Sequence, residues 1–196
     1  TLIMFNENKE KSYIVVDKFY KNPDTIRSFA YQQQFIYNEK FYKGMRTPKT
    51  FLFEGLKEEF ETLIGEQITD WENHQFNGCF QVTSAENLQV YHCDENTWAG
   101  VVYLTPDAPA QSGTCLYRSK ITGQNDNRIA SQEEKNTIFA GGFYDSTKFE
   151  KTDDVGNIYN RLVLFRGTRI HSAGPYFGKN LGDGRLVHLF FFNTTR

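Results

Sequence analysis

Hydrophobic and polar residues alternate with a different period before and after about residue 75. In the first part, the apolar run Tyr13–Val16 predicts a short buried strand. Asn22, Pro23 and Asp24 have the order of an N-cap, a first-turn proline and a first-turn acid, so a helix should follow. A second packing helix is expected over about residues 55–64, because four apolar residues share one helical face there: Leu56, Phe60, Leu63 and Ile64.

After residue 75 the chain reads as short strands separated by turn residues. Many short strands after a helical part are typical of a jelly roll or sandwich with packing helices, a mainly β (α+β) fold. We expect all 196 residues to form a single domain, in which residues 1–75 supply the N-terminal strand and helices and residues 76–193 the β core. The expected strands are residues 76–82, 87–92, 97–104, 113–119, 161–165, 168–173 and 185–193.

A long polar excursion interrupts the expected strands between Ser119 and Tyr159. It is rich in Asn, Asp and Lys and contains one apolar island, residues 138–144. A connection of that length without secondary structure is uncommon and often covers a functional site. Two interpretations are open: a lid over a site, or a solvated excursion.

Composition narrows the functional classes. The net charge of −2 argues against binding to nucleic acid or to a membrane surface, and no run approaches the roughly 18 apolar residues of a membrane span. Three cysteines do not suggest a disulfide framework, so a reducing, cytoplasmic location is expected. Five of the last 40 residues are arginines, which suggests that the C-terminal strands meet an anion.

The first candidate for chemistry is the pair His92 and Asp94. In an extended strand, residues i and i+2 point to the same face, so this imidazole and this carboxylate should lie together while Cys93 points away. A second histidine would complete a triad of two histidines and one carboxylate, which suits Fe(II) because it leaves coordination positions open. Alone, the pair is equally well explained as a surface histidine beside a turn carboxylate.

Three other histidines could supply the third ligand. His74 precedes the strands and is expected at the surface. His188 alternates with Arg185 along the last strand, so it cannot face the site if Arg185 does. His171 lies far from His92 in the sequence, and only a closed β fold would bring the two together.

The residues between Phe76 and Asn193, apart from the polar excursion, resemble the Fe(II)- and 2-oxoglutarate-dependent dioxygenase superfamily, with prolyl-hydroxylase-like enzymes as the nearest branch. This resemblance implies a double-stranded β-helix (jelly roll). The matching motifs occur in the order of that family: His92-Cys93-Asp94 as its His-x-Asp motif, residues 101–105 and 112–116 as the next two strands, residues 161–165 before the distal histidine, His171 as that histidine, and Arg185 at the start of the last strand.

The resemblance also implies roles for individual residues. His92, Asp94 and His171 would be the catalytic Fe(II) ligands, and 2-oxoglutarate would chelate the metal. Arg185 would bind the distal carboxylate of 2-oxoglutarate through its planar fork. Tyr103 aligns with a tyrosine that binds the same carboxylate, although an ordinary core tyrosine explains it almost as well.

Two positions depart from the family pattern. Val187 stands where a Ser or Thr often makes a second contact to the carboxylate, and Val82 stands where prolyl-hydroxylase-like enzymes often have another tyrosine. These departures concern the contacts to 2-oxoglutarate and leave the metal triad intact.

The leading hypothesis is therefore an Fe(II)- and 2-oxoglutarate-dependent oxygenase that uses O2 to hydroxylate a C–H bond, with release of succinate and CO2. A non-catalytic jelly-roll binding module with a vestigial metal site is the main alternative, and a cupin-type enzyme is a third. The substrate stays open: a peptidyl residue, a free amino acid, another small molecule or a damaged base. Trp98, Arg118 and Arg161 are candidates for the substrate side.

Overall fold

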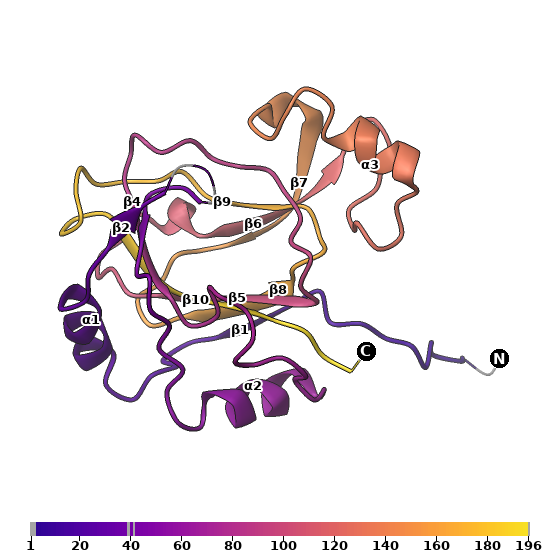
Figure 1. The fold of residues 1–196 in the computed structure, drawn as a ribbon. Helices are drawn as coiled ribbons and strands as arrows, with labels where there is room; N and C mark the ends of the chain where they lie inside the picture. Colours follow the sequence, from indigo (N-terminus) through magenta and orange to yellow (C-terminus); the bar gives the residue numbers. More distant parts are fainter. Residues whose placement is uncertain (1–2, 39, 41, 196) are drawn as a thin grey trace.

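Two antiparallel sheets form most of the computed structural model, which describes residues 3–38, 40 and 42–195 (Figure 1). Seven strands pair in the order β1-β8-β5-β10-β4-β3-β2, and three pair in the order β7-β6-β9. The strands are β1 Tyr13–Val16, β2 Ile36–Tyr37, β3 Met45–Arg46, β4 Phe80–Thr83, β5 Trp98–Tyr103, β6 Thr114–Ser119, β7 Phe149–Val155, β8 Leu162–Arg166, β9 His171–Ala173 and β10 Arg185–Phe192; the helices are α1 Pro23–Tyr31, α2 Leu56–Ile64 and α3 Gln132–Ile138, with short 3-10 helices η1 Ala110–Ser112 and η2 Ser146–Lys148. The mainly β fold with a few packing helices is confirmed.

Strand β10 lies in the middle of the large sheet and is buried on both faces, which explains its almost continuous apolar sequence. Its even-numbered residues, among them Leu186 and His188, face the helices. Its odd-numbered residues Val187 and Leu189 face the small sheet, where they pack against Leu116 of β6. The expected alternation is confirmed, and His188 points away from the space between the two sheets.

Helices α1 and α2 cover the outer face of the large sheet, on the side away from the small sheet (Figure 1). Phe60 of α2 lies edge-on against Phe190 of β10, with their ring centroids 4.9 Å apart. The expected N-terminus of α1 is observed at Pro23, although the side chain of Asn22 makes no capping hydrogen bond. Gly65 ends α2 in the left-handed conformation, with φ of 79°, which glycine adopts without steric cost.

Strand β1 is less buried than its apolar sequence suggested. It lies at an edge of the large sheet, paired only with β8, and Tyr13 and Val15 are each more than a third exposed. The expected strand at residues 87–92 is also wrong, because only His92 forms an isolated bridge, to His171. These segments are extended but gain few ladder hydrogen bonds.

The polar excursion is more ordered than its composition suggested. It contains α3, which begins with a capping box in which Ser131 and Glu134 each accept a hydrogen bond from the backbone of the other. It also contains β7, which pairs along the whole of β6. Polar side chains hid β7 from sequence reasoning, because β7 is an edge strand with one face exposed to water.

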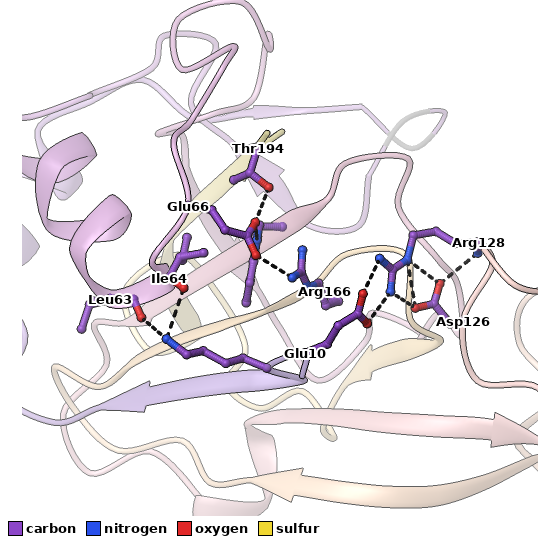
Figure 2. A network of polar contacts seen from close by, with 10 residues as sticks. Glu10, Leu63, Ile64, Glu66, Asp126, Arg128, Arg166 and Thr194 are labelled. Atoms are coloured by element: carbon purple, nitrogen blue, oxygen red, sulfur yellow. Dashed lines mark hydrogen bonds and ion pairs between the residues drawn. The ribbon is translucent and has the colours of Figure 1, made fainter. Parts of the chain in front are cut away.

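A network of charged residues fastens the segment before β1 to the rest of the fold (Figure 2). Lys11 donates from Nζ to the carbonyl oxygens of Leu63 and Ile64, the last two residues of α2. A cation at this end of a helix satisfies carbonyls that lack an intrahelical partner. Glu10, on the adjacent position, pairs with Arg128 at 3.1 Å.

Glu66 forms a buried ion pair with Arg166 at 2.7 Å, in the same region (Figure 2). The carboxylate also accepts hydrogen bonds from Thr194 and from the indole of Trp98. Burial opposes ionisation of Glu66, but these donors and the Arg166 charge bring its pKa below the usual value.

The expectation of a single domain stays a proposal, which is supported by the way β1, β2 and β3 from the N-terminal part extend the same sheet as β4 and β10. Among the residues described, no helix is long and apolar enough to cross a membrane.

Glu66→Gln should lower the free energy of unfolding at pH 7 by about 3 kcal/mol, because Arg166 would remain buried without its anion. Since the folded state lowers the pKa of Glu66, its contribution is complete above the unfolded-state pKa near 4.5 and is lost as the pH falls through the folded-state pKa. Urea unfolding at several pH values would measure both. The matched control is Glu10→Gln, where the exposed pair should contribute less than about 1 kcal/mol. Equal effects of the two substitutions at pH 7 would contradict the claim that the buried Glu66–Arg166 pair stabilises the fold more than the exposed Glu10–Arg128 pair.

Candidate functional site

Strand β9, at an edge of the small sheet, and the segment over residues 92–94 that pairs beside it bring His92, Asp94 and His171 together. The backbones of His92 and His171 exchange hydrogen bonds of 3.1 and 2.9 Å, and the amide of Asp94 donates to the carbonyl of Gly167 at 2.7 Å. This pairing places the two imidazole rings 4.3 Å apart. One ligand atom from each of the three residues lies within 4.8 Å of the others.

The paired segments approach so closely that position 167 needs a glycine. A Cβ at Gly167 would lie 2.6 Å from the carbonyl oxygen of Asn96 and 3.3 Å from the Cβ of Asp94. Any side chain would push the strand carrying His171 away from the segment carrying His92. The sequence Arg166-Gly167 therefore contributes to the site through backbone packing.

Each imidazole is held by a hydrogen bond to a backbone carbonyl. Nδ1 of His92 lies 3.1 Å from the oxygen of Val90, and Nδ1 of His171 lies 2.8 Å from that of Arg169. A carbonyl only accepts, so both Nδ1 atoms carry the proton and both Nε2 atoms keep a lone pair. Nε2 of each ring lies 3.5 Å from a different oxygen of Asp94. Carbonyl-oriented histidines of this kind are usual in metal sites.

The charge states of the three residues suit a cation. Burial, and then the nearby His92, lower the pKa of His171 to about 4, so its ring is neutral at pH 7. Burial opposes ionisation of Asp94, but the two imidazoles keep its pKa below the usual value. For His92, burial is outweighed by the Asp94 carboxylate, which raises the pKa.

Asp94 has a buried carboxylate oxygen that a bound cation would satisfy. Its Oδ2 atom is buried and has no hydrogen-bond partner. An unpaired buried carboxylate oxygen is costly. Two imidazole nitrogens and one carboxylate oxygen are the donor set of the facial triad that binds non-haem Fe(II), so the residues present fit that ion.

A cavity of about 600 Å³ opens beside the three residues and includes Thr114, Tyr176 and Arg185 in its lining. Its size is in the range of small-molecule sites. Phe143 and Tyr144, from the apolar island of the polar excursion, also line it and are about half exposed. Their position is compatible with the lid interpretation, which stays a hypothesis.

Arg185, at the start of β10, presents a buried cation to this cavity. It is 5% exposed and donates to the backbone oxygens of Ser112 at 2.8 Å and Gly113 at 3.3 Å. Its guanidinium lies 5.3 Å from the ring of Tyr103 and 5.9 Å from the ring of Tyr176. Among the described residues, no carboxylate lies within ion-pair distance of it.

Tyr103 faces the inter-sheet core with Val101, as expected. Its hydroxyl shares a hydrogen bond of 2.7 Å with Oγ1 of Thr114, and Thr114 in turn lines the cavity. Burial raises the pKa of Tyr103. Thr114 therefore brings to the cavity wall a hydroxyl that sequence reasoning did not assign.

Three candidates for the substrate side do not reach the cavity. Trp98 is fully buried on the opposite face of β5, where its indole donates to Glu66. Arg118 is exposed and pairs with Glu150, and Arg161 pairs with Asp17. The correction for Trp98 follows from the alternation of β5, because Ala99 and Val101 face the cavity side and Trp98 faces the other.

Other cavity residues were missed or misplaced. His74 is half-buried and lines the cavity, with its ring tilted against that of Phe191 at a centroid distance of 5.3 Å, a position that the expectation of a surface or helix-end histidine did not include. Val82 faces the helix-side core, whereas its neighbour Gln81 faces the cavity. Only the family motif marked Val82, and the alternation of β4 was the signal that could have marked Gln81. Tyr176 and Arg46 lie outside long strands, and no periodic pattern marks them.

The fold is that of the 2-oxoglutarate-dependent oxygenases. HygX from Streptomyces hygroscopicus, solved with nickel, 2-oxoglutarate and hygromycin B bound, superposes with a TM-score of 0.61 at 12% sequence identity, over 94% of this chain and 83% of that chain. A prolyl hydroxylase from Trichoplax adhaerens, in complex with a peptide fragment of the hypoxia inducible factor oxygen degradation domain, gives a TM-score of 0.51 at 14% identity, over 93% and 84%. At these identities the likeness establishes the fold.

The chain itself belongs to the family of unknown function DUF6445, whose model matches residues 3–192. No curated protein matches the chain in a sequence comparison. The jelly-roll resemblance stated from the motifs is thus confirmed at the level of fold, and its implications for activity require argument from the site.

Asp94→Asn should lower the melting temperature of the metal-free protein slightly, because the imidazoles of His92 and His171 favour the ionised carboxylate in the folded state. The same variant should lose the stabilisation by Mn(II) that we expect for the wild type, because a ligand is gone. Thermal unfolding with and without Mn(II) measures both effects. His74→Ala is the control, since His74 lies outside the ligand cluster and should keep the metal response. An intact Mn(II) shift in Asp94→Asn would rule out the metal centre.

Proposed function

We propose that this protein is an Fe(II)- and 2-oxoglutarate-dependent oxygenase that hydroxylates a C–H bond of its substrate. The observation that carries the proposal is the pairing of two unsatisfied charges in one cavity. Oδ2 of Asp94 lies between two metal-ready imidazoles without a partner, and Arg185 is a buried guanidinium without a carboxylate. A divalent cation and a dicarboxylate satisfy both at once.

His92, Asp94 and His171 would hold the metal through Nε2, a carboxylate oxygen and Nε2. Bound Fe(II) and 2-oxoglutarate would supply the oxidising chemistry, in which O2 is consumed, succinate and CO2 are released and a C–H bond is hydroxylated. The hydrogen bonds from Nδ1 to Val90 and Arg169 fix the ring orientations before the metal arrives.

Arg185 is oriented to bind the distal carboxylate of 2-oxoglutarate. Ser112 and Gly113 accept from Nε and Nη2, which fixes the plane of the guanidinium and leaves the Nη1 donors for an anion. Val187 offers no hydroxyl beside it, but Thr114 lines the cavity and shares a hydrogen bond with Tyr103. We propose that this pair replaces the missing Ser or Thr contact.

Apolar walls would keep water from the reacting groups. The ring of Phe165 stands edge-on to His171 with centroids 4.8 Å apart, and Leu189 and Phe191 line the same cavity. A dry wall strengthens the interaction between Arg185 and a carboxylate, because few waters screen it.

The substrate is proposed to be a small molecule or a peptidyl residue. HygX has hygromycin B bound and the prolyl hydroxylase is solved with a peptide, so the shared fold admits both. A cavity of about 600 Å³ accommodates either a small molecule or one side chain of a peptide.

Arg185→Met should weaken binding of N-oxalylglycine, a non-reactive mimic of 2-oxoglutarate, by about 100-fold in the presence of Mn(II), because a buried charge pair is lost. Mn(II) binding itself should not change. Isothermal titration calorimetry measures the two affinities separately. Arg118→Met, at an exposed arginine paired with Glu150, serves as the matched control and should bind both normally. Unchanged affinity for N-oxalylglycine in Arg185→Met would remove Arg185 from the cosubstrate site.

Turnover separates an oxygenase from a binding module of the same fold. Purified under anaerobic conditions and supplied with Fe(II), 2-oxoglutarate and O2, the wild type should release succinate, slowly without substrate and faster with it. His92→Ala, Asp94→Ala and His171→Ala should each abolish this release, because each removes one ligand. Mass spectrometry of succinate gives the readout. If N-oxalylglycine binds but the wild type releases no succinate above the three variants, the non-catalytic alternative is correct.

A further inference from the structure

A second guanidinium, that of Arg46, lines the same cavity. Arg46 ends β3, lies opposite Gln81 of β4, and donates from Nε to its side-chain oxygen at 3.1 Å. Its guanidinium carbon lies 4.7, 5.1 and 5.7 Å from the ring centroids of Tyr42, Phe76 and Phe191. Three aromatic rings and one amide therefore fix the position of this cation in the cavity wall.

No protein carboxylate neutralises Arg46. Among the described residues, none lies within ion-pair distance of it. Glu95, which also lines the cavity, is exposed. Arg46 is nevertheless near enough to Asp94, His92 and Tyr176 for its charge to act on each of them. A cation held by aromatic rings rather than by an acid keeps its charge available for a ligand.

If the proposed function holds, the charges of the metal, the cosubstrate and their ligands cancel and leave no negative charge for Arg46. Fe(II) contributes +2, Asp94 −1, Arg185 +1 and 2-oxoglutarate −2, which sum to zero. None of these four groups supplies a counter-charge to Arg46, and Glu95, the other acid of the described lining, is exposed. Lys43 lies over the ring of Tyr144, 5.1 Å from its centroid, on the exposed side.

We infer that Arg46 binds an anionic group of the substrate, a carboxylate or a phosphate, while Arg185 holds the cosubstrate. The planar fork of the guanidinium suits both oxyanions. The rings of Tyr42, Phe76 and Phe191 beside it provide an apolar surface for the rest of the molecule. The substrate class is therefore a small molecule, or a terminal or acidic peptidyl residue, that carries one negative charge next to an apolar group.

The test uses the protein loaded with Mn(II) and N-oxalylglycine and four probes: 3-phenylpropionate, phenyl phosphate, and their neutral counterparts 3-phenylpropionamide and phenol. Calorimetry should show binding of at least one anion to the wild type, and Arg46→Gln should weaken it by about tenfold or more. The carboxylate and phosphate arms identify which oxyanion is preferred. Neutral probes should bind more weakly and should not respond to the substitution.

Two further variants control for folding and for charge in general. Arg46→Lys keeps the charge without the planar fork and should bind the anion with intermediate affinity, even if Arg46→Gln is destabilised by the loss of its ring contacts. Arg118→Gln, on the surface away from the cavity, should bind like the wild type. N-oxalylglycine affinity should stay within about threefold of the wild type in both Arg46 variants.

The inference is overturned if no anion binds the loaded wild type, if the neutral probes bind as tightly as the anions, or if Arg46→Gln keeps full anion affinity. If Arg46→Gln loses N-oxalylglycine binding while the wild type keeps it, Arg46 belongs to the cosubstrate site. This result ends the inference and leaves the oxygenase proposal intact. Failure of the wild type itself to bind N-oxalylglycine would refute the proposed function, and the charge count with it.

Discussion

The structure depends on one short stretch of backbone pairing, in which His92 and His171 exchange two hydrogen bonds. Neither residue lies in a long strand beside the other, so two main-chain bonds and the Asp94–Gly167 bond set the distance between the rings. The hydrogen bonds from Nδ1 then decide which nitrogen faces Asp94. Main-chain groups thus determine how the three proposed metal ligands lie relative to one another.

The large sheet supplies the second half of the arrangement. Because β10 is central and buried on both faces, a charged residue on it is held where little of its surface is exposed to solvent. Arg185 occupies the first position of that strand, where it faces carbonyl groups rather than acids. The guanidinium of Arg185, from the large sheet, and the carboxylate of Asp94 therefore line the same cavity. Neither buried charge would stabilise an ordinary apolar core.

How far the sequence predicts this protein depends on the regularity of each segment. The long alternation of β10 correctly placed His188 with the helices, because a period of two over eight residues allows only one assignment. In the four residues of β4, the family motif marked Val82, whereas Gln81 is the residue that lines the cavity. The sequence did not predict strand β7 because its exposed residues are polar or charged. It did not predict the position of Arg46 because a strand of two residues has no period. Trp98 was misassigned because the alternation of β5, which sets it on the opposite face from Val101 and Tyr103, was not applied to it.

The hairpin of β2 and β3 lies at the far edge of the large sheet, joined to it only through β4. Each of its strands has two residues, so few interior contacts depend on their identity. The three proposed metal ligands come instead from β9, at an edge of the small sheet, and from the segment that pairs beside it. If the proposals hold, the hairpin could therefore be exchanged, and substrate specificity with it, without a change in the proposed metal ligands.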